Sequence, residues 1–231
     1  MDLMLKMSEI IAELNKYNYH YYTLDTPLVS DKEYDALYDE LVAMEVETGK
    51  VLPDSPTQRV GGELLKGFTP HRHLAPLWSL DKAQNIEQLR SWNVRVHRLV
   101  NEYNGRNPGN PLPAPCYAVE LKFDGLTLNL TYRDGILVQA ATRGNGVTGE
   151  GILAQVKTIQ SVPLSIPFQE GVIEVQGEGI MNLSVLADYN TRAAEPLKNA
   201  RNGAAGALRN LNPKTTASRR LNAFFYNIGY A

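Results

Sequence analysis

Residues 126–142 read LTLNLTYRDGILVQAAT, and this stretch decides the fold of the larger part of the chain. Leucines and a tyrosine alternate with threonine, asparagine and arginine over residues 126–133, which is the period of a strand with one buried face. Asp134-Gly135 is a tight-turn signal, and residues 136–142 return as a second strand. The stretch therefore predicts an antiparallel hairpin, and a further strand is predicted from Val172 to about Gln176.

The chain before this hairpin is predicted to be mostly helical. Ser30-Asp31-Lys32-Glu33 is a capping box, and it opens a helix that follows a break at Asp25-Thr26-Pro27. The helix before the break carries one apolar stripe, formed by Leu3, Met7, Ile10, Leu14, Tyr17 and Tyr21. A third helix is predicted to start at Asn85, with Gln88 completing a second box. Its expected buried face consists of Ile86, Leu89, Trp92, Val96, Leu99 and Tyr103.

This order of elements predicts the α+β class. A helical hairpin module is expected at residues 1–66, followed by a domain with an antiparallel sheet at residues 67–231. Charge separates the two parts, because residues 1–65 carry 13 acidic and 5 basic side chains whereas residues 190–220 are strongly basic. The single cysteine, Cys116, excludes an internal disulfide and a cysteine-rich zinc site. No signal peptide or membrane-spanning run is found, so the cytoplasm is the expected compartment, without a membrane partner.

A lysine in the run Glu120-Leu121-Lys122-Phe123-Asp124-Gly125 is the main candidate for chemistry. The alternation expected from Cys116 onward would put Glu120, Lys122 and Asp124 on one face of a strand. A lysine held among carboxylates, where the backbone turns at a glycine, is how a lysine nucleophile would be presented. Taken alone, the same letters also fit a surface hairpin with a Lys–Asp pair worth about 0–1 kcal/mol.

Other groups of residues fit a nucleotide ligand. Arg143 precedes Gly144-Asn145-Gly146, where glycines allow close approach of a phosphate or ribose, although an ordinary turn is the alternative. Glu178 could hold a ribose hydroxyl or a magnesium ion, or lie on a charged edge strand. Arg201 and Arg209 flank small residues and could neutralise phosphates, or belong to a closely packed helix.

Tyrosines and aspartates gather near the end of the first helix and the start of the second. Asp31 and Asp35 share a helix face, where two carboxylates repel each other unless a cation lies between them. Tyr21 and Tyr34 beside them would suit a flat, positively charged ring such as a pyridinium. The alternative is that the tyrosines are core residues and the aspartates cap a helix.

Together these segments closely resemble the N-terminal part of bacterial NAD-dependent DNA ligase, from about Tyr17 to Tyr230. The resemblance makes Lys122 the nucleophile that receives AMP and assigns Asp124 to the reaction centre. It gives NAD-binding roles to Tyr21, Tyr22, Asp31, Tyr34 and Asp35 for the nicotinamide mononucleotide half, to Ser79, Leu80 and Glu120 for adenosine, and to Arg143 and Glu178 for ribose and phosphate. It assigns Arg201 and Arg209 to contacts with nicked duplex DNA.

The resemblance further implies NAD and Mg²⁺ as cofactors, a monomer, and the sealing of nicks in DNA replication and repair by the intact enzyme. Asn145 departs from the aspartate of many relatives, which would alter charge near the site. The chain ends at Ala231, before the family's D-G-x-V-x-K motif, so an N-terminal portion of the nucleotidyltransferase domain with poor turnover of its own is expected. The alternatives are an ATP-dependent RNA ligase or capping-type nucleotidyltransferase, and a non-catalytic NAD- or DNA-binding module.

Overall fold

The computed structural model describes residues 3–22, 24, 26–60, 66–168 and 170–231. The chain forms two compact units. We call the first the large unit, which comprises Met1–Leu77 and Phe123–Ala231. The second, Trp78–Lys122, is the small unit. This division into compact units differs from the expected domain boundary between residues 66 and 67. That boundary between two functional modules stays a prediction.

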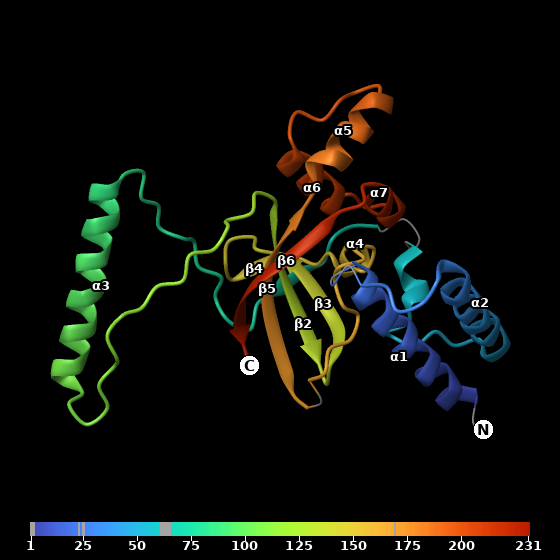
Figure 1. Ribbon diagram of the computed structural model, residues 1–231, viewed down its shortest axis with the longest axis horizontal. Helices are drawn as coiled ribbons and strands as arrows, with labels where there is room; N and C mark the ends of the chain where they lie inside the picture. The colour runs from blue at the N-terminus through green and yellow to red at the C-terminus, as the bar shows by residue number, and fades with distance from the viewer. Residues whose placement is uncertain (1–2, 23, 25, 61–65, 169) are drawn as a thin grey trace. The chain divides into compact units, whose positions relative to one another are not determined.

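The predicted helical hairpin is present in the large unit (Figure 1). It consists of α1 (Leu3–Tyr22) and α2 (Asp31–Thr48). The Ser30 side chain accepts a hydrogen bond from the Glu33 backbone, and the Glu33 carboxylate accepts one from the Ser30 backbone, so the predicted capping box is confirmed. The expected break involves Asp25, which lies outside the described residues. The hairpin has its own core, formed by Met7, Ile10, Ile11, Leu14, Leu41 and Met44.

A four-stranded antiparallel sheet forms the body of the large unit, in the order β3-β2-β5-β6 (Figure 1). Its strands are β2 (Leu126–Arg133), β3 (Ile136–Thr142), β5 (Val172–Ile180) and β6 (Asn222–Tyr230). Asp134 and Gly135 both adopt the left-handed backbone, with φ of 49° and 80°, that a two-residue hairpin of this kind requires. The predicted hairpin is therefore confirmed, whereas β5 runs four residues past the predicted end and includes Glu178.

The two faces of this sheet differ in chemistry. Leu128, Leu130 and Tyr132 lie on the apolar face, where α4 (Leu153–Val156) and α6 (Ala200–Leu208) pack. On the other face three polar pairs lie opposite each other across β2 and β5: Thr127 with Glu178, Asn129 with Gln176, and Thr131 with Glu174. A second sheet, β1 (Pro70–Arg72) with β4 (Thr148–Glu150), was not predicted, because three-residue strands are too short to show a period. The short helices α5 (Leu183–Arg192) and α7 (Pro213–Ser218) complete the unit.

An arginine fastens the segment after the helical hairpin to the body of the large unit. Arg59 lies in the 3₁₀ turn η1 (Pro56–Val60) and is buried. Its guanidinium donates to the carbonyl oxygens of Ile159 and Val162, each at 2.8 Å. Nearby, Lys157 donates through Nζ to Gln58 at 2.6 Å, and burial lowers the pKa of this lysine.

The small unit holds one helix, α3 (Ile86–Arg106), which begins at the predicted cap. The Asn85 side chain accepts a hydrogen bond from the Gln88 backbone, as predicted. The Gln88 side chain, however, accepts from the Gln84 backbone rather than from the Asn85 backbone, so the second predicted capping box is incomplete. The predicted buried face is wrong for this unit, because none of the α3 residues is buried and no second helix or strand is present in residues 78–122 to cover them. Trp92 instead lies beside the Tyr117 ring, 5.2 Å between centroids.

The strand predicted from Cys116 is also absent. Residues 111–124 have no regular secondary structure, so Glu120, Lys122 and Asp124 do not share a strand face. Pro111, Pro113 and Pro115 cannot donate backbone hydrogen bonds, and the alternation that follows them has no neighbouring strand in the small unit with which to pair.

We expect Arg59→Met to lower the free energy of unfolding by about 2–4 kcal/mol, because the buried carbonyl groups of Ile159 and Val162 lose a charged donor. Urea unfolding followed by circular dichroism measures the change. Arg133→Met is the matched control, since Arg133 is exposed and such a substitution changes stability by about 0.5 kcal/mol or less. Equal losses in both variants would remove the special role of Arg59.

Candidate functional site

The residues around Gly125 form the first part of the site, at one end of the β2–β5 pair. The Asp124 carboxylate accepts a hydrogen bond from Arg201 Nη1 at 2.7 Å. Glu178, which is buried, accepts from the Gly125 backbone at 3.2 Å. The hydrogen bond to Asp124 raises the pKa of Arg201, and the charge of Glu178 adds to this effect. The structure thus brings together three predicted residues from distant parts of the chain.

The glycine of the K-x-D-G run, Gly125, is required because its backbone lies close to the backbone of Gly179 in β5. A Cβ atom at Gly125 would lie 2.1 Å from the carbonyl oxygen of Gly179, so no larger residue fits without movement of β5. The Phe123 ring stacks on Phe224 of β6, with centroids 4.2 Å apart. The residues that follow Lys122 are therefore fixed on the sheet by packing and by backbone contacts.

Tyr226 is a residue of this group that the sequence reasoning missed. Burial raises the pKa of the Tyr226 phenol, the charge of Glu178 raises it further, and Arg143 and a hydrogen bond with Thr127 oppose the shift. The charges of Glu178 and Arg143 thus act on this phenol in opposite directions. The alternation of Phe224, Tyr226 and Ile228 was the available signal, but a strand at 222–230 was not predicted.

The turn that contains Arg143 is built around Asn145. The Asn145 side-chain oxygen accepts from the backbones of Val147 at 3.0 Å and Thr148 at 2.8 Å. Aspartate offers the same acceptor, so the asparagine keeps the turn while it removes a charge. Arg209, another arginine predicted to belong to the site, forms an ion pair with Glu150 at 3.3 Å on the surface.

The second part of the site is a pocket of about 280 Å³ in the helical hairpin. Tyr21, Asp31, Tyr34 and Asp35 line it, so the structure groups four residues that were predicted to act together. The side chain of Tyr22 lies outside the described part of the structure. The remaining lining residues, which were not predicted, are Tyr17, Asn18, Pro27, Leu28 and Val29.

This pocket combines aromatic walls with acidic groups. Asp31 and Asp35 are exposed, and Asp31 lies in the first turn of α2, where the helix dipole favours a carboxylate. The Tyr34 ring stacks on Tyr38, with centroids 6.2 Å apart, which fixes its orientation. Such a pocket can hold a planar cationic ring, through the faces of its tyrosines and the charge of its aspartates.

Four predicted residues belong to the small unit: Ser79, Leu80, Glu120 and Lys122. All four are exposed within that unit and lie in irregular segments near its two ends. Lys122 directly precedes Phe123 in the chain, so two peptide bonds separate it from Asp124. The approach of the other three residues to the nucleotide stays a prediction.

An α+β unit whose antiparallel sheet carries carboxylates, with arginines in a neighbouring turn and helix and a K-x-D-G run before β2, is a nucleotidyltransferase domain. The family model of the NAD-dependent DNA ligase adenylation domain matches residues 65–231, and that of the DNA ligase-like, N-terminal NAD+-binding domain matches residues 2–61. The chain belongs to the NAD-dependent DNA ligase family, and the predicted resemblance is confirmed.

Bacterial relatives support this assignment along the whole chain. The DNA ligase of Alkaliphilus oremlandii is 62% identical over 230 residues, which cover 100% of this chain and 33% of that protein. The DNA ligase of Clostridium tetani is 57% identical over 98% of this chain and 34% of its own length, and that of Finegoldia magna is 56% identical over 97% and 34%. The chain thus spans about a third of the curated relatives it matches. Among the described residues, no helix is both long and apolar enough to cross a bilayer.

We expect Gly125→Ala to destabilise the large unit by about 1–3 kcal/mol, the usual effect of forcing an extra carbon into a packed site. Gly206→Ala is the matched control, because nothing lies within 4 Å of a Cβ atom there. In the helix α6 this control should be neutral or stabilising by up to about 1 kcal/mol. Thermal unfolding of both variants tests the contact, and equal stability of the two would contradict it.

Proposed function

We propose that this chain is the NAD-binding and adenylation portion of an NAD-dependent DNA ligase, and that Lys122 is the residue that receives AMP. The observation that carries the proposal is the pocket of Tyr21, Asp31, Tyr34 and Asp35. The nicotinamide half of NAD presents a planar cationic ring, which this pocket suits, whereas ATP has no such ring. The pocket therefore favours NAD over ATP as the source of AMP.

The first step is a displacement at the adenylyl phosphorus of NAD. The neutral Nζ of Lys122 attacks this phosphorus, a P–N bond forms, and the P–O bond to nicotinamide mononucleotide breaks. The amine gives up its proton to water, and nicotinamide mononucleotide leaves with the electron pair of the broken bond. A lysine must be neutral to attack, and nearby carboxylates favour its charged form. The ion pair of Arg201 with Asp124 reduces this pull, because the guanidinium offsets the carboxylate charge.

The sheet supplies the contacts that would hold the adenosine half of NAD. Glu178 uses one oxygen for the Gly125 backbone, and we assign its second oxygen to a ribose hydroxyl. Arg143 offers a planar fork for a phosphate. Ser79, Leu80 and Glu120 would contact the adenosine from the small unit. Mg²⁺ would offset charge on the phosphates during transfer.

The later steps concern the whole ligase. AMP passes from Lys122 to the 5′-phosphate of a nick, and the 3′-hydroxyl then displaces AMP to seal the strand. Arg201 and Arg209 are exposed enough to meet DNA phosphates. To do so, each arginine must first break its ion pair with a carboxylate. Exposed ion pairs of this kind contribute about 0–1 kcal/mol, so the free energy needed to break them is small. We infer a monomeric, cytoplasmic enzyme that acts in DNA replication and repair.

We expect the double variant Asp31→Asn, Asp35→Asn to raise the Kd for nicotinamide mononucleotide about thirtyfold, if each exposed carboxylate contributes about 1 kcal/mol. Binding of adenosine monophosphate should not change. Isothermal titration calorimetry measures both ligands, and added salt should shrink the difference. Asp39→Asn is the matched control on the same helix and should behave as the unchanged chain does. Equal affinity in all three proteins would remove the pocket from NAD binding.

We expect a ligase that carries this chain to gain one AMP on Lys122 after incubation with NAD, and Lys122→Arg to gain none, because the arginine side chain is always protonated. Mass spectrometry of tryptic peptides locates the AMP. Lys82→Arg is the control, since Lys82 is also exposed in the small unit, and it should leave the adduct intact. AMP on another lysine would refute the assignment, and an adduct formed from ATP but not from NAD would favour the ATP-dependent alternative.

A further inference from the structure

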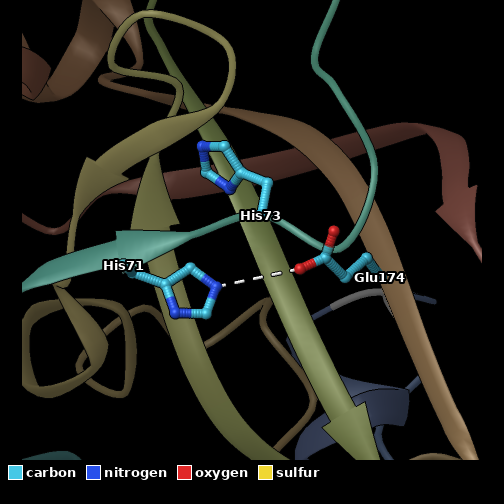
Figure 2. A group of neighbouring side chains, drawn as sticks. All are labelled: His71, His73 and Glu174. Atoms are coloured by element: carbon cyan, nitrogen blue, oxygen red, sulfur yellow. Dashed lines mark ion pairs between the residues drawn. The ribbon is translucent and has the colours of Figure 1, made fainter.

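Two histidines face the polar side of the sheet from the short strand β1 and the residue after it. His71 and His73 are two positions apart, so extended backbone directs both side chains the same way. Glu174 of β5 points toward them, as Figure 2 shows. One possible ligand atom from each of the three residues lies within 4.8 Å of the others. All three belong to the large unit.

The burial of Glu174 calls for a cationic partner. The Glu174 side chain has no exposed surface, and an ionised carboxylate is costly to bury unless a charge compensates it. It accepts hydrogen bonds from the Leu74 backbone at 3.1 Å and from the Thr131 hydroxyl at 3.3 Å, both of which are neutral donors. The cationic partner is therefore not supplied by these two bonds.

Within the described residues, two further buried atoms of this polar group have no hydrogen-bond partner: Nε2 of His71, and Oδ1 of Asn129, whose amide nitrogen contacts His73. His71 Nε2 is 3.8 Å from Glu174 Oε1, which is too far for a hydrogen bond. The spacing suits an ion between them, because zinc lies about 2.0–2.2 Å from each nitrogen or oxygen ligand. Ligand atoms of a tetrahedral zinc ion lie about 3.4 Å apart, so atoms as far apart as 4.8 Å would have to approach by about 1.4 Å, which side-chain rotation can supply.

The hydrogen bonds of His73 prepare it to bind a metal. Its Nε2 lies 3.1 Å from the carbonyl oxygen of Arg143, an acceptor, so the proton resides on Nε2 and the lone pair on Nδ1. A metal-bound histidine usually makes this hydrogen bond through its other nitrogen. Nδ1 now contacts the Asn129 amide at 3.0 Å, and this contact would give way to the ion. Nδ1 of His71 lies 3.2 Å from the amide nitrogen of Gln139, so metal binding through Nε2 of His71 requires this amide to turn by 180° and its oxygen to accept from Nδ1–H.

We propose that His71, His73 and Glu174 form a binding site for one divalent transition-metal ion of the zinc class. Two imidazole nitrogens and a carboxylate suit zinc, cobalt and nickel, whereas Mg²⁺ prefers oxygen ligands alone. The site is therefore separate in chemistry from the Mg²⁺ of nucleotide transfer, and it goes beyond the proposed function. Its effect is to fasten residues 70–74 to β5, the strand that also carries Glu178.

Zinc titration of the metal-free chain by calorimetry tests the site. We expect one Zn²⁺ per chain and a rise in the melting temperature with zinc concentration. His71→Gln should weaken zinc binding by more than about 100-fold, since loss of a residue that merely orients a ligand weakens it about 10–100-fold. His97→Gln is the matched control from α3, and Cys116→Ser removes the rival thiol ligand. Both should bind zinc as the unchanged chain does.

A second measurement keeps the test decisive if His71→Gln fails to fold. Nitrogen NMR of the unchanged chain should show zinc-dependent shifts of His71 Nε2 and His73 Nδ1, with His20 and His97 unmoved. Cobalt bound at the same site should give the visible absorption of a nitrogen- and oxygen-ligated ion. No binding, zinc shifts at His20 or His97, or loss of zinc in Cys116→Ser would each overturn the proposal. A protonated His71 that pairs with Glu174 and ignores zinc would also overturn it.

Discussion

The pairing of β2 with β5 is the constraint on which the rest of the structure depends. Its register sends Leu128 and Leu130 into the core while Thr131 and Glu174 meet on the opposite face. A slip of one residue would exchange the two faces and bury carboxylates among apolar side chains. The same pairing brings Gly125 against the end of β5, so the core, the polar face and the segment after Lys122 are fixed together.

The polar face serves two purposes along one strand. At one end of β5, Glu178 receives the Gly125 backbone and lies near the Asp124–Arg201 pair and Tyr226. Four residues earlier, Glu174 is wholly buried beneath residues 71–74. The first carboxylate holds the Gly125 backbone and is the one we propose to meet the nucleotide, whereas the second accepts from Leu74 in the chain that covers it. The difference follows from what covers each position, because both glutamates point to the same side of the sheet.

Some of the arginines in the basic stretch at residues 190–220 form ion pairs and ring contacts within the fold. Asp188 forms ion pairs with both Arg192 and Arg220, and the Arg219 guanidinium lies 3.8 Å from the centre of the Tyr189 ring. These arginines stabilise α5 and the chain near it. The acidic hairpin, in contrast, keeps Asp31 and Asp35 exposed around its pocket. Neither carboxylate has an ion-pair partner in the part of the chain that the structure describes, and like charges at a concave surface indicate a cationic ligand more strongly than a net charge does.

The sequence by itself determined the local elements: the capping box at Ser30, the turn at Asp134-Gly135, and the helices and the hairpin around them. It also grouped Tyr21, Asp31, Tyr34 and Asp35, because these residues are close along the chain. Only the tertiary structure decided that residues 116–124 form no strand, that Arg201 meets Asp124 across 77 positions, and that Leu74 meets Glu174 across 100. Capping and turn chemistry act within a few residues and leave a readable pattern. Contacts between distant segments depend on the register of whole strands, for which short segments carry no periodic signal.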